Sequence, residues 1–127
     1  MRGTILVVDD EADLCWLFTK SLTREGFKVM TARNGHEALA LVAQEPPDLI
    51  LLDLVMPGMD GLETLRRLRE QGGMVKVVIL TAYGTAQRAR EAMALGVREL
   101  LGKPFDLNRL LRIVVEEVEG NTLRRAG

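Results

Sequence analysis

The stretch LILLDLVMPGMDG, residues 49–61, combines the pattern of a buried strand with a turn and the start of a helix. Four consecutive apolar residues lead directly into Asp53, and a segment rich in Pro and Gly follows. An uninterrupted apolar run of this length, bounded by turn residues, is typical of a strand buried on both faces of a parallel sheet. Asp53 would then lie at the carboxyl end of that strand, where binding crevices form in open α/β sheets. Its carboxylate either caps the next loop or takes part in chemistry.

Four further short runs of apolar and β-branched residues are followed by polar or turn residues, as expected for strands. They span residues 4–8, 28–32, 76–80 and about 99–102. Helical spacing of apolar residues fills the intervals, and the expected helices span residues 14–25, 37–44, 61–70, 86–95 and 107–118. The connections are short, and each crossover is long enough for a helix. The pattern therefore predicts a doubly wound (βα)5, flavodoxin-like α/β fold: a five-stranded parallel sheet in the order 2-1-3-4-5 with helices on both faces.

Length and composition limit the class of protein. The 127 residues suit one domain, which we expect at residues 1–120, followed by a flexible polar tail at residues 121–127. Seventeen basic residues nearly balance eighteen acidic ones, so bulk charge gives no argument for nucleic-acid or membrane binding. A single cysteine and a single histidine exclude an internal disulfide and a zinc site built from several such residues. Without a membrane-spanning stretch or a signal-peptide pattern, a cytoplasmic location is expected.

The first expected helix has an apolar face and one aromatic residue outside it. Asp13 is in place to cap this helix, and its apolar face consists of Leu14, Leu17, Phe18 and Leu22. Trp16 lies roughly opposite that face. Because large aromatic residues are enriched in binding hot spots, Trp16 is a candidate partner contact. The alternative is that Trp16 packs against a neighbouring element.

Five polar residues follow the ends of four predicted strands. They are Asp9 and Asp10, Asp53, Thr81, and Lys103. Each has an ordinary structural explanation, as a turn residue, a strand end or a solvated lysine. In a parallel sheet, however, all these strand ends share one edge, and convergent polar groups in a crevice are typical of a functional site.

The chemistry of this set is coherent. Three neighbouring carboxylates repel one another and need a cation. Oxygen ligands without histidine or cysteine favour Mg²⁺, or a similar ion such as Mn²⁺, which accepts phosphate oxygens as further ligands. A carboxylate is a competent nucleophile toward a phosphoryl group, and phosphoryl transfer needs charge neutralisation and in-line positioning. Lys103 would supply charge, and the Thr81 hydroxyl would donate to a phosphoryl oxygen.

These residues resemble the receiver domain of bacterial two-component response regulators over essentially the whole chain. The matching segments are residues 7–11, 53–61, Thr81-Ala82 and 103–105. The resemblance implies that a sensor histidine kinase or a histidine phosphotransferase phosphorylates Asp53. It further implies that Thr81 and Lys103 hold the phosphoryl group and that the bond between Lys103 and Pro104 is cis.

The resemblance also implies a metal site and an output surface. Asp10, Asp53 and the backbone carbonyl of Val55 would bind Mg²⁺ directly, and Asp9 would help through water. The chain would act as a signalling phosphoacceptor that catalyses its own phosphorylation and dephosphorylation, rather than as an enzyme. Its output would pass through residues 86–95, 99–102 and 107–118 to an output domain or protein, and a homodimer through this surface fits the family. No direct contact with nucleic acid or a membrane is implied.

Four positions bear on how this chain would differ from the family pattern or meet its partner. Leu100 occupies the place of the usual aromatic switch residue, so the switch would rest on Thr81 and on the loop around Tyr83. Val55 and Tyr83 flank the phosphoryl group in the family, and neither offers an acid or amide to orient water. We therefore expect slow hydrolysis of the aspartyl phosphate. The resemblance implies that the first helix, which carries Trp16, and the loop between the fifth strand and the last helix receive the kinase.

Two other functions fit the same sheet order. A flavodoxin-type cofactor binder would want a Gly-rich or Ser/Thr-rich phosphate cradle after the first strand, where residues 9–11 are all acidic. A phosphohydrolase with an aspartyl nucleophile would want a second acid at position 55, which is a valine. Phosphorylation by acetyl phosphate that is lost in Asp53→Asn separates these readings.

Overall fold

A computed structural model describes residues 2–71, 73–82 and 86–126 of the chain. The strands are β1 (Thr4–Val8), β2 (Lys28–Ala32), β3 (Leu49–Asp53), β4 (Lys76–Thr81) and β5 (Glu99–Gly102). The helices are α1 (Ala12–Arg24), α2 (Gly35–Gln44), α3 (Gly61–Glu70), α4 (Ala86–Ala94) and α5 (Leu107–Ala126). All strands are parallel and lie in the order β2-β1-β3-β4-β5, so the predicted sheet and its order are confirmed.

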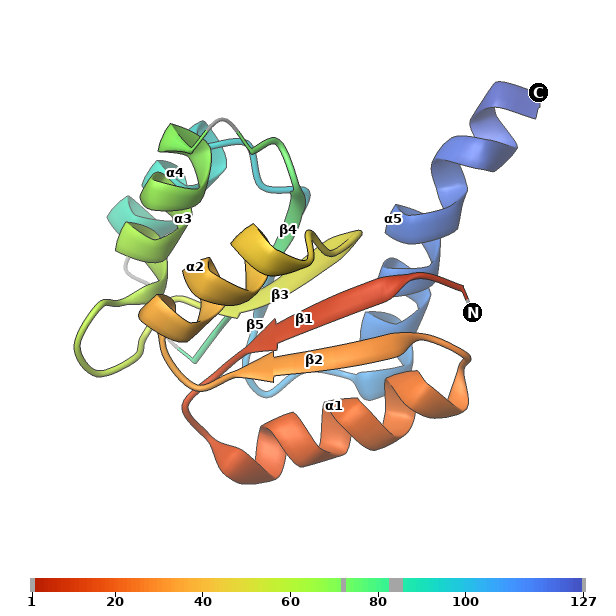
Figure 1. Cartoon of the computed structure of the whole chain (residues 1–127), viewed down its shortest axis with the longest axis horizontal. Helices are drawn as coiled ribbons and strands as arrows, with labels where there is room; N and C mark the ends of the chain where they lie inside the picture. The colour runs from red at the N-terminus through yellow and green to blue at the C-terminus, as the bar shows by residue number, and fades with distance from the viewer. Residues whose placement is uncertain (1, 72, 83–85, 127) are drawn as a thin grey trace.

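The side chains of each strand alternate between two separate cores. Helices α1 and α5 cover one face of the sheet, and α2, α3 and α4 cover the other (Figure 1). On β3, Leu49 and Leu51 face α1 and α5, whereas Ile50 and Leu52 face the other three helices. All four side chains are fully buried, which explains why this strand has an uninterrupted apolar sequence. The two cores fix Asp53 at the end of the most deeply buried strand.

The first helix differs from the prediction in two details. Asp13 lies in the first turn, and the N-cap position is Glu11, whose side chain makes no capping hydrogen bond. The buried residues of α1 are Cys15, Phe18 and Leu22, whereas Leu17 is 37% exposed. The helix is therefore rotated toward Cys15, and the expectation that Leu17 belongs to the buried face was wrong.

Two glycines allow helices to approach neighbouring backbone and side chains closely. A Cβ atom at Gly61 would lie 2.1 Å from the carbonyl oxygen of Asp53, and one at Gly35 would lie 2.2 Å from Oγ1 of Thr64. Any side chain at either position would push these segments apart. Gly61 therefore lets α3 begin directly against the end of β3.

Helix α5 continues past the end of its predicted apolar stripe to Ala126, and its last turns project beyond the sheet (Figure 1). The helix bounds do not test whether residues 121–127 are flexible, so that flexibility stays a prediction. Within the described part of the chain, no helix has the length and apolar character needed to cross a membrane.

Candidate functional site

The carboxyl ends of the strands bring the predicted polar residues to one edge of the sheet. Asp53 is paired in register with Leu80, directly before Thr81, and Thr81 is paired with Gly102, directly before Lys103. Asp9 follows the last residue of β1. The parallel register therefore places residues from four strand ends side by side.

Three carboxylates form the centre of this edge. Asp9, Asp10 and Asp53 each offer an oxygen within 4.8 Å of the others, a spacing that suits a shared metal ion. Asp9 is 1% exposed and Asp53 is 4% exposed, whereas Asp10 is half-buried. Three close carboxylates of this kind repel one another, and a hard divalent cation with oxygen ligands is the group that fits them.

Lys103 neutralises part of this charge from the loop after β5. Its Nζ lies 3.0 Å from Oδ2 of Asp9, 3.5 Å from Oδ2 of Asp53 and 4.0 Å from Oε1 of Glu11. Burial lowers the pKa of Lys103, but the hydrogen bond to Asp9 and the surrounding negative charges outweigh burial and raise the pKa above its ordinary value. Lys103 is therefore a permanent cation within reach of the Asp53 carboxylate.

Asp53 is held in place by its own backbone. The N–H of Val55 donates to Oδ1 of Asp53 at 3.1 Å, which leaves Oδ2 toward Lys103. Burial raises the pKa of Asp53, although the Val55 hydrogen bond and the Lys103 charge oppose this rise. The Asp53 anion is therefore costly in the absence of further positive charge.

Thr81 contributes a hydroxyl that is buried and unused. Among the side chains described, its Oγ1 is the one buried polar atom without a hydrogen-bond partner. An unsatisfied buried hydroxyl costs free energy, so its position at this edge fits a group that arrives from outside the chain.

The loop after β5 carries Lys103, and the peptide bond between Lys103 and Pro104 is cis, as predicted. The ring of Phe105 stacks on Phe18 with centroids 5.5 Å apart, which anchors this loop to α1.

The segment between β3 and α3 is tied to α4. Asp60 is the N-cap of α3 and accepts a hydrogen bond from the N–H of Glu63 at 2.9 Å. Its other carboxylate oxygen accepts from the guanidinium of Arg88 on α4. The same segment carries Val55, whose side chain is 50% exposed. Asp60 therefore connects the segment that follows Asp53 to α4.

The remaining predicted residues lie away from Asp9, Asp10 and Asp53, which together form the acid cluster. Leu100 is half-buried on β5 and packs against the core beneath α2, α3 and α4. Trp16 is 62% exposed on the outer side of α1, and the ammonium of Lys20 lies 4.8 Å from its ring centroid. The position opposite the core was predicted correctly for Trp16. Tyr83 lies outside the described residues.

Sequence reasoning missed two residues that support the acid cluster. The Cys15 thiol donates to the carbonyl of Asp9 at 3.3 Å, and the Arg33 guanidinium donates to the carbonyl of Asp10. No local pattern marks either contact, because both form only after strands and helices pack. The N-cap role of Asp60 could have been predicted from the sequence, because an acid three residues before Glu63 is a capping pattern.

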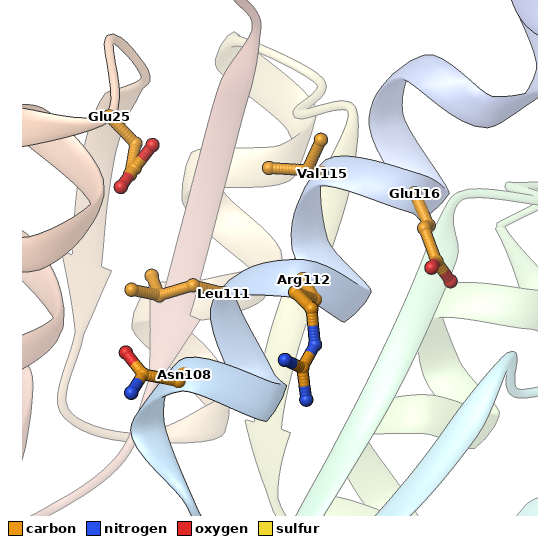
Figure 2. Close-up of a pocket in the computed structure, with 6 residues that line it drawn as sticks. All are labelled: Glu25, Asn108, Leu111, Arg112, Val115 and Glu116. Atoms are coloured by element: carbon orange, nitrogen blue, oxygen red, sulfur yellow. The ribbon is translucent and has the colours of Figure 1, made fainter.

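The structure also has a cavity away from the three clustered carboxylates. A cavity of about 410 Å³ lies along α5 near the end of α1, lined by Glu25, Asn108, Leu111, Arg112, Val115 and Glu116 (Figure 2). None of these residues belongs to the acid cluster. This cavity is therefore separate from the strand edge that carries the candidate site.

Comparisons with known proteins agree with this geometry. A sequence profile described as the response regulator receiver domain matches residues 5–115. Sporulation initiation phosphotransferase F of Bacillus subtilis is 39% identical over 110 residues, covering 87% of this chain and 89% of that protein. The DNA-binding transcriptional regulator NtrC of Salmonella typhimurium is 37% identical over 113 residues, covering 89% of this chain. The chain spans only 24% of the length of that regulator.

A solved structure gives the same result. The chemotaxis protein CheY4 of Vibrio cholerae superposes with a TM-score of 0.82 at 31% identity, covering 88% of this chain and 95% of that one. The profile covers most of the chain, and sequence and structure agree. The chain belongs to the response regulator receiver domain family and has the role of a signalling phosphoacceptor.

Proposed function

We propose that Asp53 accepts a phosphoryl group from the phosphohistidine of a sensor histidine kinase or a histidine phosphotransferase. One observation carries this proposal: the Asp53 carboxylate lies 3.5 Å from the Lys103 ammonium and within 4.8 Å of two other carboxylates, beside the partnerless hydroxyl of Thr81. A nucleophile, a cation and a free hydrogen-bond donor are the groups that phosphoryl transfer requires.

In the proposed step, an Asp53 oxygen forms a bond to phosphorus while the phosphorus–nitrogen bond of phosphohistidine breaks. The electron pair of that bond leaves with the imidazole nitrogen. Lys103 binds one of the phosphoryl oxygens, and the Thr81 hydroxyl donates a hydrogen bond to another. The Val55 N–H keeps the attacking carboxylate in its orientation.

The donor set fits Mg²⁺ or Mn²⁺, which would be held by Asp10, Asp53 and the Val55 carbonyl, with Asp9 acting through water. When bound, such an ion neutralises charge that develops on the transferring phosphoryl oxygens. The protein's own part is to keep three carboxylates close together and to hold Lys103 beside them.

Val55 supports a long-lived phosphoprotein. Its side chain is exposed beside the carboxylate and carries no group that orients an attacking water. We expect self-catalysed hydrolysis with a half-life of minutes or longer in the isolated protein. A half-life of seconds, measured by loss of radiolabelled phosphate, would contradict this expectation.

The proposed partners occupy two different surfaces. The donor kinase docks against α1, where Trp16 is exposed, and a cytoplasmic location places the chain with such a kinase. The output passes through α4, β5 and α5 to an output domain or protein, or to a second copy of this chain. Leu100 replaces the usual aromatic ring, so the switch relies on Thr81 and on α4, which is tied to the site by Asp60 and Arg88.

The test uses acetyl phosphate as a small phosphodonor with and without Mg²⁺. Wild type is expected to gain an acid-stable, base-labile phosphoryl group only with Mg²⁺, and Asp53→Asn is expected to gain none. Asp13→Asn is a matched control, because Asp13 is an exposed carboxylate in the first turn of α1. Turnover of acetyl phosphate without a stable phosphoprotein would favour a hydrolase instead.

A further inference from the structure

The loop between β1 and α1 carries two of the three clustered carboxylates, and Asp9 is held in it from several sides. Its N–H donates to the carbonyl of Ala32 at 3.1 Å, and its Oδ1 accepts from the N–H of Glu11 at 2.9 Å. Its carbonyl accepts from the thiol of Cys15 at 3.3 Å. The backbone and side chain of Asp9 therefore have little freedom.

Asp10 is held differently, through its backbone alone. Among the described residues, none forms a hydrogen bond or ion pair with its carboxylate, which remains available as a ligand. Its carbonyl accepts two hydrogen bonds from Arg33, at 3.3 Å from Nε and 2.9 Å from the terminal nitrogen. No side chain caps α1, since Glu11 at the N-cap position makes no capping bond. The two bonds from Arg33 therefore fix the carbonyl of Asp10 in this turn.

Arg33 is itself anchored where α2 begins. Its N–H donates to Oε2 of Glu37 at 3.3 Å, and the N–H of Glu37 donates to the side chain of Asn34 at 2.9 Å. These bonds fix the backbone from which the guanidinium extends. Arg33 thus connects the ordered start of α2 to the loop that carries Asp10.

We propose that Arg33 is a positioning residue for the metal site, because it holds the Asp10 backbone in the shape that aims the Asp10 carboxylate at the shared ion. The inference rests on the proposed metal binding. The guanidinium binds a carbonyl and forms no ion pair with the clustered carboxylates, so it does not compete for their oxygens. Its exposed charge also repels a cation, but salt screens that repulsion.

The test compares Mg²⁺ binding by Arg33→Ala, Arg33→Lys and wild type using titration calorimetry. Removal of groups that orient metal ligands costs about 10–100-fold in affinity, and because Arg33 is exposed we expect a smaller loss than this. We expect Arg33→Ala to bind Mg²⁺ about 3–10-fold more weakly. Arg33→Lys, which keeps one donor, is expected to recover part of the loss. Phosphorylation by acetyl phosphate at saturating Mg²⁺ should recover its wild-type rate.

Arg24→Ala is the matched control, because it removes the same charge from the exposed far end of α1. Melting in EDTA establishes that each variant is folded, and Arg33→Gln replaces the alanine variant if the latter is not. Wild-type or tighter Mg²⁺ binding by Arg33→Ala would overturn the inference, as would an equal loss in Arg24→Ala. Failure of wild type itself to bind Mg²⁺ would instead overturn the proposed metal site.

Discussion

Helices α1 and α4 lie on opposite faces of the sheet and are held there by different forces. Helix α1 buries Cys15, Phe18 and Leu22, and the ring of Phe18 stacks on Phe105. Helix α4 buries only Ala92 among the side chains described for it. Arginines connect α4 to α3. Arg88 of α4 pairs with Asp60, and Arg66 of α3 pairs with Glu91. Arg69 of α3 donates to the carbonyl of Leu95, just beyond the end of α4.

The difference shows which helix a charge change can move. Apolar packing loses free energy steeply when a side chain leaves its place, because a cavity remains. Ion pairs near the surface contribute little and exchange easily with water. Segments with few buried apolar contacts open at lower cost than packed ones. If Asp53 accepts a phosphoryl group as proposed, α4 is the element that the new charge would displace, while α1 would remain a fixed surface.

The largest expected effect comes from removing part of the apolar packing that holds α1 on the sheet. Phe18→Ala removes a fully buried ring and its stack on Phe105, and we expect a loss of about 3–5 kcal/mol in the free energy of unfolding. Urea denaturation measures it. Met93→Ala, at an exposed position of α4, should change stability by less than about 0.5 kcal/mol. Equal losses in both variants would contradict the comparison.

The next effect concerns Arg69, a half-buried residue of α3 that binds the carbonyls just beyond the end of α4. Arg69 donates to the carbonyls of Leu95 and Gly96 at the end of α4, and to those of Gly73 and Val75 before β4. Burial lowers its pKa, yet arginine stays charged at neutral pH. Removing the guanidinium leaves these carbonyls unpaired.

We therefore expect Arg69→Met to cost about 1–3 kcal/mol. Hydrogen exchange should accelerate in α4 and stay unchanged in α1. Arg67→Met is the control, because Arg67 is exposed and pairs only weakly with Glu63 at 3.8 Å. Faster exchange in α1 than in α4 would refute the role given to Arg69.

The next prediction concerns the effect of the Asp53 charge on stability, because this charge lies at the edge between the two faces of the sheet. Burial raises the pKa of Asp53 above its ordinary value of 3.8. The contribution of the protonated Asp53 carboxyl to the free energy of unfolding is fully present below pH 3.8. It is lost as pH rises through the raised pKa, because the buried carboxyl then becomes charged. Without metal, Asp53→Asn should therefore melt a few degrees higher than wild type at neutral pH, and the gap should close toward pH 4.

Thermal melting in EDTA across this pH range measures the gap, with Asp13→Asn as the control. Mg²⁺ should raise the melting temperature of wild type by linkage and that of Asp53→Asn much less. A variant that is less stable than wild type at neutral pH would show that Lys103 already compensates the Asp53 charge.

The smallest effect isolates one contact of α4. Asp60→Asn removes the charge that pairs with Arg88 but keeps a good N-cap for α3. The expected loss is about 0–1 kcal/mol, typical of a part-exposed ion pair. Exchange at the N-terminal end of α4 should nevertheless increase. Unchanged exchange there would mean that the contact does not hold α4 in solution.

The sequence was sufficient for the sheet because its strands are short apolar runs buried on both faces. It was also sufficient to bring Asp9, Asp53, Thr81 and Lys103 together, since parallel strands end at one edge. Their roles in phosphoryl transfer stay predictions. The reasoning depended on topology alone and needed no side-chain geometry.

Contacts between separate loops could not be predicted in this way. The bond from Arg33 to Asp10 exists only because β2 pairs with β1 and brings two loops together. The rotation of α1 that buries Cys15 and exposes Leu17 depends on which strands and loops lie beneath it. The capping position moved to Glu11 because the chain stays extended there, before the helix begins.

The exposed ring on α1 has a practical consequence for experiments. Trp16 is the single tryptophan of the chain, and most of its surface meets solvent beside Lys20. Intrinsic tryptophan fluorescence therefore originates from the outer surface of α1 alone. Its emission should be that of a hydrated indole, quenched by soluble iodide. A blue shift on mixing with a candidate kinase would report docking at α1 without any added label.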